Sequence, residues 1–141
     1  HAGDKTMRLA ERGRWVLLHH EVPPSKTPLG RRGTHWDLMI ENAGALWTWA
    51  IQELPPCSEA AALRLPDHRI RYLDYEGPIS DGRGTVSRVA GGEFQRPGDF
   101  QENLFCITVS WPNAESMIKF EWSKEDHWRI DWSSRDTSSA T

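Results

Sequence analysis

The chain has 141 residues, 38% of them hydrophobic and 26% charged, the composition expected of one ordinary globular domain. Its net charge of -3 excludes a broad electrostatic clamp on nucleic acid but allows a small pocket that binds one strand end. Since no apolar run approaches the ~20 residues of a membrane span and two cysteines make no disulfide framework, we expect a monomeric cytoplasmic protein with packed thiols.

The predicted elements are short alternating strands separated by Gly, Pro, Asn or Asp, a pattern typical of a sandwich or small barrel. We expect an arm over residues 1–13, one domain over 14–132 and a flexible tail over 133–141. The eight tryptophans fall almost entirely in strand-like segments, which favours aromatic packing in an all-β core. Strands are expected near 14–20, 34–41, 45–52, 62–66, 84–90, 103–111, 116–122 and 127–132.

The connections between these strands carry recognisable turn chemistry. Residues 41–44 (Glu-Asn-Ala-Gly) predict a hairpin turn, and 111–114 and 123–126 predict the turns of a C-terminal meander. Residues 58–62 predict one helical turn with Ser58 as its N-cap. The segment 21–33 is a long loop rich in proline and glycine, of the kind that is usually functional or mobile.

The strand over 34–41 places a histidine and a carboxylate on the same side. Because side chains alternate along a strand, Trp36, Leu38 and Ile40 share one face while His35 and Asp37 share the other. An imidazole and a carboxylate at this spacing suit a divalent metal such as manganese or zinc. For the triplet alone, a half-buried strand with a solvated polar face is the commoner explanation.

Other polar side chains in the sequence accompany this strand. The first strand ends in His19-His20, and adjacent strand residues face opposite ways, so only one of the two can join His35. Further along, His68 and Tyr72 stand four residues apart; alone, they would be a loop histidine and a packing tyrosine. The Gly-Arg-Gly turn over 82–84 is explained by a tight hairpin without any function.

Taken in order, these stretches resemble the 3′-phosphoesterase domain of bacterial DNA ligase D and its stand-alone relatives. The resemblance covers roughly residues 14–95 and implies a small closed β-barrel of about eight mostly antiparallel strands, with short helical turns on its flank. The matching stretches are 16–20 (Val-Leu-Leu-His-His), 35–39 (His-Trp-Asp-Leu-Met), 48–51 (Thr-Trp-Ala-Ile), 66–72 (Pro-Asp-His-Arg-Ile-Arg-Tyr), 75–77 (Tyr-Glu-Gly) and 82–86 (Gly-Arg-Gly-Thr-Val).

The resemblance also implies an activity, a hydrolase of DNA repair by non-homologous end joining. Such enzymes use manganese to remove 3′-terminal ribonucleosides and phosphates from DNA or RNA–DNA primer ends. A DNA ligase, a polymerase or an end-binding repair protein would be the partner. Carried over by position, the metal ligands are His20, His35 and Asp37, while His68 and Tyr72 contact the scissile phosphate. Zinc and cobalt would suit the same ligands as manganese.

Two positions depart from the pattern of the resemblance. Met39 stands where the family has an arginine, and a thioether cannot grip phosphate as a guanidinium does. Glu53 stands where the family has a lysine. We therefore keep open a catalytically weak or inactive module that binds a strand end or a repair partner. If the domain is an enzyme, we expect Arg31 or Arg32 to fold back and supply the missing phosphate contact.

Overall fold

The computed structural model describes residues 8–53, 59–111 and 114–134, and nearly all of its regular structure is strand. The two short helices are α2 (Pro28–Arg32) and the 3₁₀ helix η1 (Ile70–Leu73). The strands are β1 (Arg12–Glu21), β2 (His35–Asn42), β3 (Ala45–Ile51), β4 (Ala60–Arg69), β5 (Gly77–Pro78), β6 (Thr85–Gln95), β7 (Leu104–Ser110), β8 (Glu115–Lys124) and β9 (His127–Ser134).

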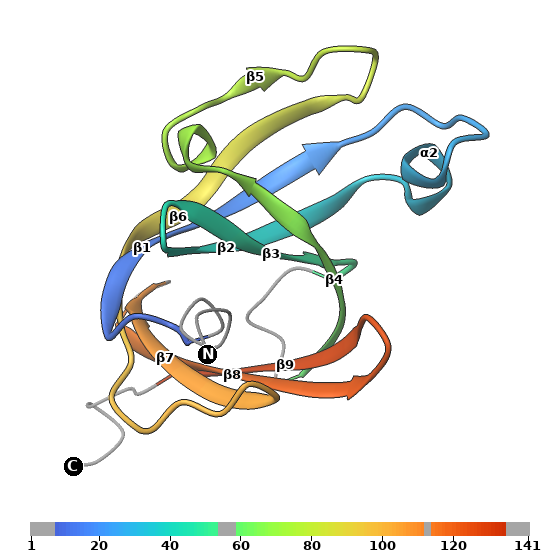
Figure 1. The fold of residues 1–141 in the computed structure, drawn as a ribbon. Helices are drawn as coiled ribbons and strands as arrows, with labels where there is room; N and C mark the ends of the chain where they lie inside the picture. Colours follow the sequence, from blue (N-terminus) through green and yellow to red (C-terminus); the bar gives the residue numbers. More distant parts are fainter. Residues whose placement is uncertain (1–7, 54–58, 112–113, 135–141) are drawn as a thin grey trace.

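These strands form a closed antiparallel barrel, which confirms the predicted fold (Figure 1). The order around the barrel is β1-β2-β3-β4-β9-β8-β7-β6, and a long pairing of β6 with β1 closes it. The short strand β5 adds to the edge of β6. Because every barrel strand has two neighbours, the eight strands leave no open edge among themselves.

The predicted hairpin turn at residues 41–44 is confirmed. Ala43 and Gly44 have φ of 52° and 83°, so both central residues adopt the left-handed conformation that a tight two-residue hairpin requires. In the predicted turn at residues 123–126, Glu125 likewise has a positive φ, of 52°. The predicted turn at 111–114 contains residues 112–113, which lie outside the described residues. The backbone N–H of Trp111 donates to the carbonyl of Ala114 across it.

The predicted helical turn at residues 58–62 is wrong where the structure describes it. Ala60 and Ala62 belong to β4, where both side chains are buried in the barrel core. This stretch pairs with β9 on one side, and Ala62 also pairs with β3, so tertiary pairing overrides the local helix propensity of the alanine run. The expected cap Ser58, and Cys57, lie outside the described residues.

The loop at residues 21–33 contains a helix that the sequence analysis did not predict. Thr27 caps α2 by accepting a hydrogen bond from the Gly30 N–H at 3.0 Å, and Pro28 occupies the first helical position. Threonine followed by proline is a common helix start, so the signal was present in the sequence. The helix has only five residues and covers one end of the cleft described below.

The barrel interior is packed with aromatic rings. Trp49 is fully buried, with ring centroids 4.6 Å from Phe120 and 5.5 Å from Trp128. Phe105 stacks on Phe120 at 4.7 Å. Most tryptophans do belong to this core, as predicted, whereas Trp122 is 40% exposed.

A second apolar layer lies outside the barrel, over β1–β3. Trp15 and Leu17 point into the barrel core, so Val16 and Leu18 point outward, and they pack with Met39 in a separate cluster. Figure 1 shows η1 and β5 above this outer face, on the side away from β7–β9. The face of β1–β3 that would otherwise meet water is therefore partly covered.

Two arginines fasten this outer layer to the barrel. Arg88 of β6 donates to the carbonyl of Leu73 in η1 at 2.6 Å. Arg14 of β1 forms two hydrogen bonds with Asp74, at 2.8 and 3.3 Å, directly after η1. Paired guanidinium–carboxylate contacts fix orientation as well as distance, so η1 is held in one place relative to β1.

A bulge in β4 turns His68 to the outer face. Leu65 pairs with Thr48 and His68 pairs with Leu46, so two residues of β4, Pro66 and Asp67, stand opposite one residue of β3. Proline has no N–H to donate to the ladder, which is why it is tolerated at a bulge. The extra residue reverses the alternation of side chains along the strand. His68 therefore lies on the same face as Leu46, which belongs to the outer cluster.

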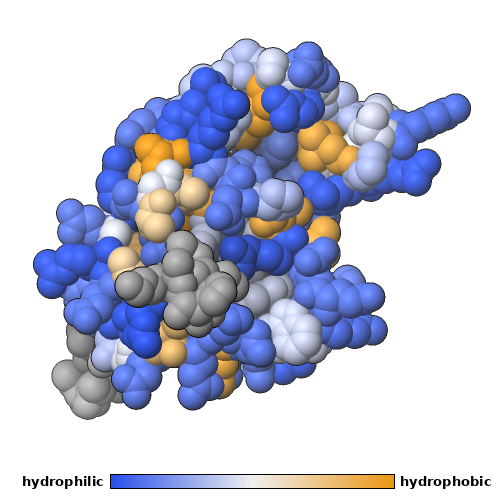
Figure 2. Space-filling view, viewed as in Figure 1, coloured by the Kyte–Doolittle hydropathy of each residue, from blue (hydrophilic) through white to orange (hydrophobic). Residues whose placement is uncertain are grey.

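On the face seen in Figure 2, hydrophobic side chains lie in separate small patches. The large hydrophobic side chains that are exposed sit on different elements: Ile70, Val89, Leu104 and Trp122. Within the described residues, no helix has the length and apolar character needed to cross a membrane.

Replacing Trp49 with alanine should lower the free energy of unfolding by about 3–5 kcal/mol, because the large cavity cannot close inside the barrel. The matched control Trp122→Ala should cost only about 1 kcal/mol, since it removes one exposed hydrogen bond to the Glu125 carbonyl. Urea denaturation followed by circular dichroism measures both. Equal destabilisation of the two variants would contradict the described core.

Candidate metal centre

The pairing of β1 with β2 brings two histidines and an aspartate together on the outer face. His20 stands directly opposite His35, and residues opposite each other in an antiparallel pair share a face. Asp37 follows two residues after His35 and therefore points the same way. The three side chains are buried, at 6%, 0% and 2% exposure, and their ligand atoms all lie within 4.8 Å of one another.

Backbone carbonyls decide which nitrogen of each imidazole faces the carboxylate. His20 Nε2 lies 2.8 Å from the carbonyl oxygen of Arg83, and His35 Nδ1 lies 2.7 Å from that of Gly33. A carbonyl only accepts, so each of these nitrogens must carry the hydrogen. The free lone pairs are then on His20 Nδ1 and His35 Nε2, which lie 3.2 and 3.1 Å from the oxygens of Asp37.

This arrangement fits a divalent cation. His35 Nε2 and Asp37 Oδ1 are buried, face each other, and have no hydrogen-bond partner among the described residues. Two lone pairs and a carboxylate that converge need a proton or a positive ion between them. Neutral imidazoles whose other nitrogen donates to a carbonyl are the usual metal ligands in proteins. His20, His35 and Asp37 therefore match both the donor chemistry and the geometry of a metal site.

The charges of the three groups favour the same conclusion. Burial would keep Asp37 neutral, but the His20 and His35 imidazoles outweigh burial and lower its pKa to about 2. Burial also disfavours charge on His20, yet the Asp37 carboxylate and the Arg83 carbonyl raise the His20 pKa above its ordinary value. The centre therefore holds an ionised carboxylate that attracts positive charge, either a proton on His20 or a metal ion in its place.

His19, the alternative to His20, points to the other side of the sheet. Its ring packs on Trp36, with centroids 5.1 Å apart, and Trp36 in turn packs against the barrel core. The choice that the sequence left open is thus made by the strand register.

The Gly-Arg-Gly turn at residues 82–84 positions His20. Gly84 has φ of 99°, and a Cβ on it would lie 2.0 Å from the carbonyl oxygen of Glu21 at the end of β1. Only glycine permits this approach. The close contact delivers the Arg83 carbonyl to the imidazole of His20. A motif that a simple hairpin could explain therefore also orients a residue of the centre.

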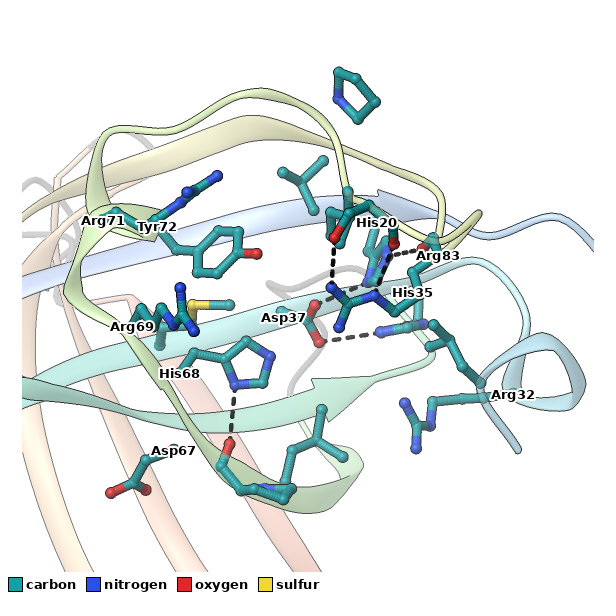
Figure 3. Close-up of a pocket in the computed structure, with 18 residues that line it drawn as sticks. His20, Arg32, His35, Asp37, Asp67, His68, Arg69, Arg71, Tyr72 and Arg83 are labelled. Atoms are coloured by element: carbon teal, nitrogen blue, oxygen red, sulfur yellow. Dashed lines mark hydrogen bonds and ion pairs between the residues drawn. The ribbon is translucent and has the colours of Figure 1, made fainter. Parts of the chain in front are cut away.

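The centre opens into a cleft of about 740 Å³, and His68 and Tyr72 stand on its opposite wall (Figure 3). His68 Nδ1 donates to the Pro66 carbonyl at 2.9 Å, which leaves Nε2 free to act in the cleft. The two rings meet edge to face at 5.9 Å. In Figure 3 the hydroxyl of Tyr72 points toward the middle of the cleft.

The sequence profile of the DNA Ligase D 3′-phosphoesterase domain matches residues 30–133, close to three quarters of the chain. The chain belongs to this family. The match includes His35, Asp37, His68 and Tyr72 but begins after His20, so the place of His20 rests on the structure. No curated protein matches the sequence.

The cleft of this DNA ligase D-type domain is basic. Its described lining residues include two aspartates, Asp37 and Asp67, and four arginines: Arg32, Arg69, Arg71 and Arg83. Of the two arginines predicted from the loop, Arg32 lines the cleft, whereas Arg31 is exposed and is not among the described lining residues. The other three were not predicted from the sequence, although Arg69 directly follows His68 and Arg71 directly precedes Tyr72.

The two departures from the family pattern have different places. Met39 lines the cleft but is 1% exposed and packs in the outer apolar cluster. Glu53 is exposed just beyond β3 and is not among the described lining residues of the cleft. The reversed charge at Glu53 therefore bears less on the cleft than the sequence suggested, while Met39 does leave this part of the wall apolar.

Divalent metal binding should depend on His20 and not on His19. We expect His20→Ala to weaken Mn²⁺ binding by more than the roughly 10- to 100-fold that removal of an outer ligand partner costs. The matched control His19→Ala should bind as the wild type does, because its ring lies on the other face. Isothermal titration calorimetry of chelator-treated protein measures both. Weaker binding by His19→Ala alone would refute the described register.

Proposed function

We propose that this domain is a metal-dependent phosphoesterase that removes a 3′-terminal ribonucleoside or a 3′-phosphate from DNA or RNA–DNA primer ends. Membership in the DNA ligase D 3′-phosphoesterase family supports this role in end joining. The observation that carries it is the buried centre of His20, His35 and Asp37 on one wall of a basic cleft. Manganese is the metal we propose, and zinc or cobalt would suit the same donors.

The chain's own residues prepare the centre for phosphate. The carbonyls of Arg83 and Gly33 keep both imidazoles in the ligand tautomer, each with a lone pair toward the Asp37 carboxylate. A divalent ion held there supplies charge stabilisation at the phosphoryl oxygens. Leu18 of β1 and Met39 of β2 pack in the outer apolar cluster on the same face as the ligands, so the ligands stand on a rigid wall.

His68 and Tyr72 act from the facing wall. The free Nε2 of His68, when protonated, can donate its proton to the leaving oxygen. The hydroxyl of Tyr72 can donate a hydrogen bond to a non-bridging oxygen. The hydrogen bonds of Arg88 to Leu73 and of Arg14 to Asp74 fasten η1, which carries Tyr72, to the barrel.

Arg32 and Arg83 complete the basic surroundings on the side of the metal centre. Arg83 is pinned by two hydrogen bonds to Ser80, from Nε at 2.9 Å and from a terminal nitrogen at 3.1 Å. A guanidinium that is already ordered loses little freedom when it binds an anion. The guanidinium groups of Arg32 and Arg83 can bind a phosphate, which the buried thioether of Met39 cannot do. A ligase or another end-joining protein in the cytoplasm would then act on the processed strand end.

The test uses primers that end in one ribonucleotide or in a 3′-phosphate. With Mn²⁺ the wild type should yield 3′-hydroxyl ends, and with EDTA it should yield none. His68→Ala should lower kcat on the order of 10²- to 10⁴-fold, as expected when a general acid is removed, while still binding Mn²⁺. His127→Ala, an exposed histidine at the start of β9, is the matched control and should cleave normally.

Two results would overturn this proposal in different ways. Metal binding without cleavage would favour the alternative, a module that binds strand ends or a repair partner. Absence of metal binding would exclude the centre itself.

A further inference from the structure

Two arginines on the wall that faces the metal centre have no role in the chemistry proposed so far. Arg69 is the last residue of β4 and Arg71 lies in η1, and both line the cleft. Figure 3 shows them on the side of His68 and Tyr72, away from the metal centre. The cleft therefore carries positive charge on both walls.

The aspartates that precede and follow these two arginines in the sequence are already paired. Asp67 lies 3.4 Å from Arg64, on the same strand. Asp74 accepts both of its hydrogen bonds from Arg14. Among the described residues, no carboxylate forms an ion pair with either arginine of the facing wall. Their charges are left for a ligand.

Arg71 is held in place by aromatic rings. Its guanidinium carbon lies 4.6 Å from the ring centroid of Tyr75 and 5.5 Å from that of Tyr72. The two tyrosines meet edge to face at 5.8 Å, and the Tyr75 hydroxyl donates to the carbonyl of Pro78. A guanidinium stacked on rings keeps its N–H edge free, and that edge matches the oxygens of a phosphate.

The cleft has room for more than one phosphate. Its volume of about 740 Å³ equals that of roughly 25 water molecules at ~30 Å³ each. One phosphate at the metal centre would leave most of this space empty. Four lining arginines against two aspartates, in a chain of net charge -3, concentrate positive charge along the whole cleft.

We propose that Arg69 and Arg71 form a second phosphate subsite, which binds the backbone phosphate next to the one at the metal centre. This inference rests on the proposed function and specifies its substrate. A strand end offers two consecutive phosphates, whereas a nucleoside 3′-monophosphate offers one. The subsite therefore makes the cleft selective for the ends of strands over mononucleotides.

The test compares two probes, a short single-stranded oligodeoxynucleotide with a 3′-phosphate and a nucleoside 3′-monophosphate. In the double variant Arg69→Ala/Arg71→Ala, the Kd of the oligonucleotide should rise about 10- to 100-fold, as is usual when charge-assisted hydrogen bonds are removed. The fold-increase in the Kd of the mononucleotide should be at least about ten times smaller than the fold-increase for the oligonucleotide. The slope of log Kd against log salt concentration for the oligonucleotide should fall by roughly 0.7 for each phosphate that the variant no longer neutralises.

Arg129→Ala is the matched control, because Arg129 is a 55% exposed arginine on β9 and is not among the described lining residues of the cleft. It should bind and cleave as the wild type does, and thermal melting should show all variants folded. Equal weakening of both probes, or an unchanged Kd for the oligonucleotide, would overturn the subsite. If the wild type cleaves and the double variant binds the oligonucleotide as tightly as the wild type does, the subsite alone is refuted. A wild type that neither binds nor cleaves refutes the proposed function as well.

Discussion

The antiparallel pairing that sets His20 opposite His35 is the constraint on which the site depends. A slip of one residue would turn every side chain of β1 to the other face. His19 would then replace His20, and Trp15 would leave the barrel core. The core and the metal centre thus require the same register: large aromatic side chains fix it from inside the barrel, and the polar centre is its consequence on the outside.

The outer wall of the barrel can hold a charged centre because a second layer covers it. Asp37 is 2% exposed beside Leu18 and Met39, and an ionised group in such surroundings costs several kcal/mol unless it is paired. A proton on His20 or a cation among the three side chains supplies that pairing, and the second nitrogens of both imidazoles are fixed by carbonyls of loops on either side. The apolar layer, the loops and the ligands therefore depend on one another. All three contribute to the binding of a cation: the ligands bind it, the loop carbonyls orient the ligands, and the apolar layer shields them from water.

Much of this arrangement was predictable because strand periodicity is simple. The alternation in residues 34–41 predicted the shared face of His35 and Asp37, and the short segments predicted an all-β barrel. Local patterns could not decide between His19 and His20, since that choice depends on which face of β1 meets the core. The helix propensity of Ala60–Ala62 misled, because pairing with two neighbouring strands decides the conformation there.

Strand periodicity could not place the facing wall, because irregular backbone positions it; His68 and Tyr72 were expected there only from the family resemblance. The bulge at Pro66 and Asp67 reverses the alternation of β4, and a short 3₁₀ helix follows at once. These features decide that His68, Arg69 and Arg71 all reach the cleft. Period-two reasoning has no means of placing three such residues on one wall. Arg31 and Arg32, in contrast, were predicted together, and α2 directs only Arg32 into the cleft.

The most direct test of this account is anomalous scattering at the manganese edge from a crystal of the protein soaked in Mn²⁺. We predict one strong peak, which marks a Mn²⁺ ion bound by Nδ1 of His20, Nε2 of His35 and the carboxylate of Asp37. The other imidazole nitrogens should still donate to the carbonyls of Arg83 and Gly33. A peak elsewhere in the cleft, or a site that uses His19, would contradict the account.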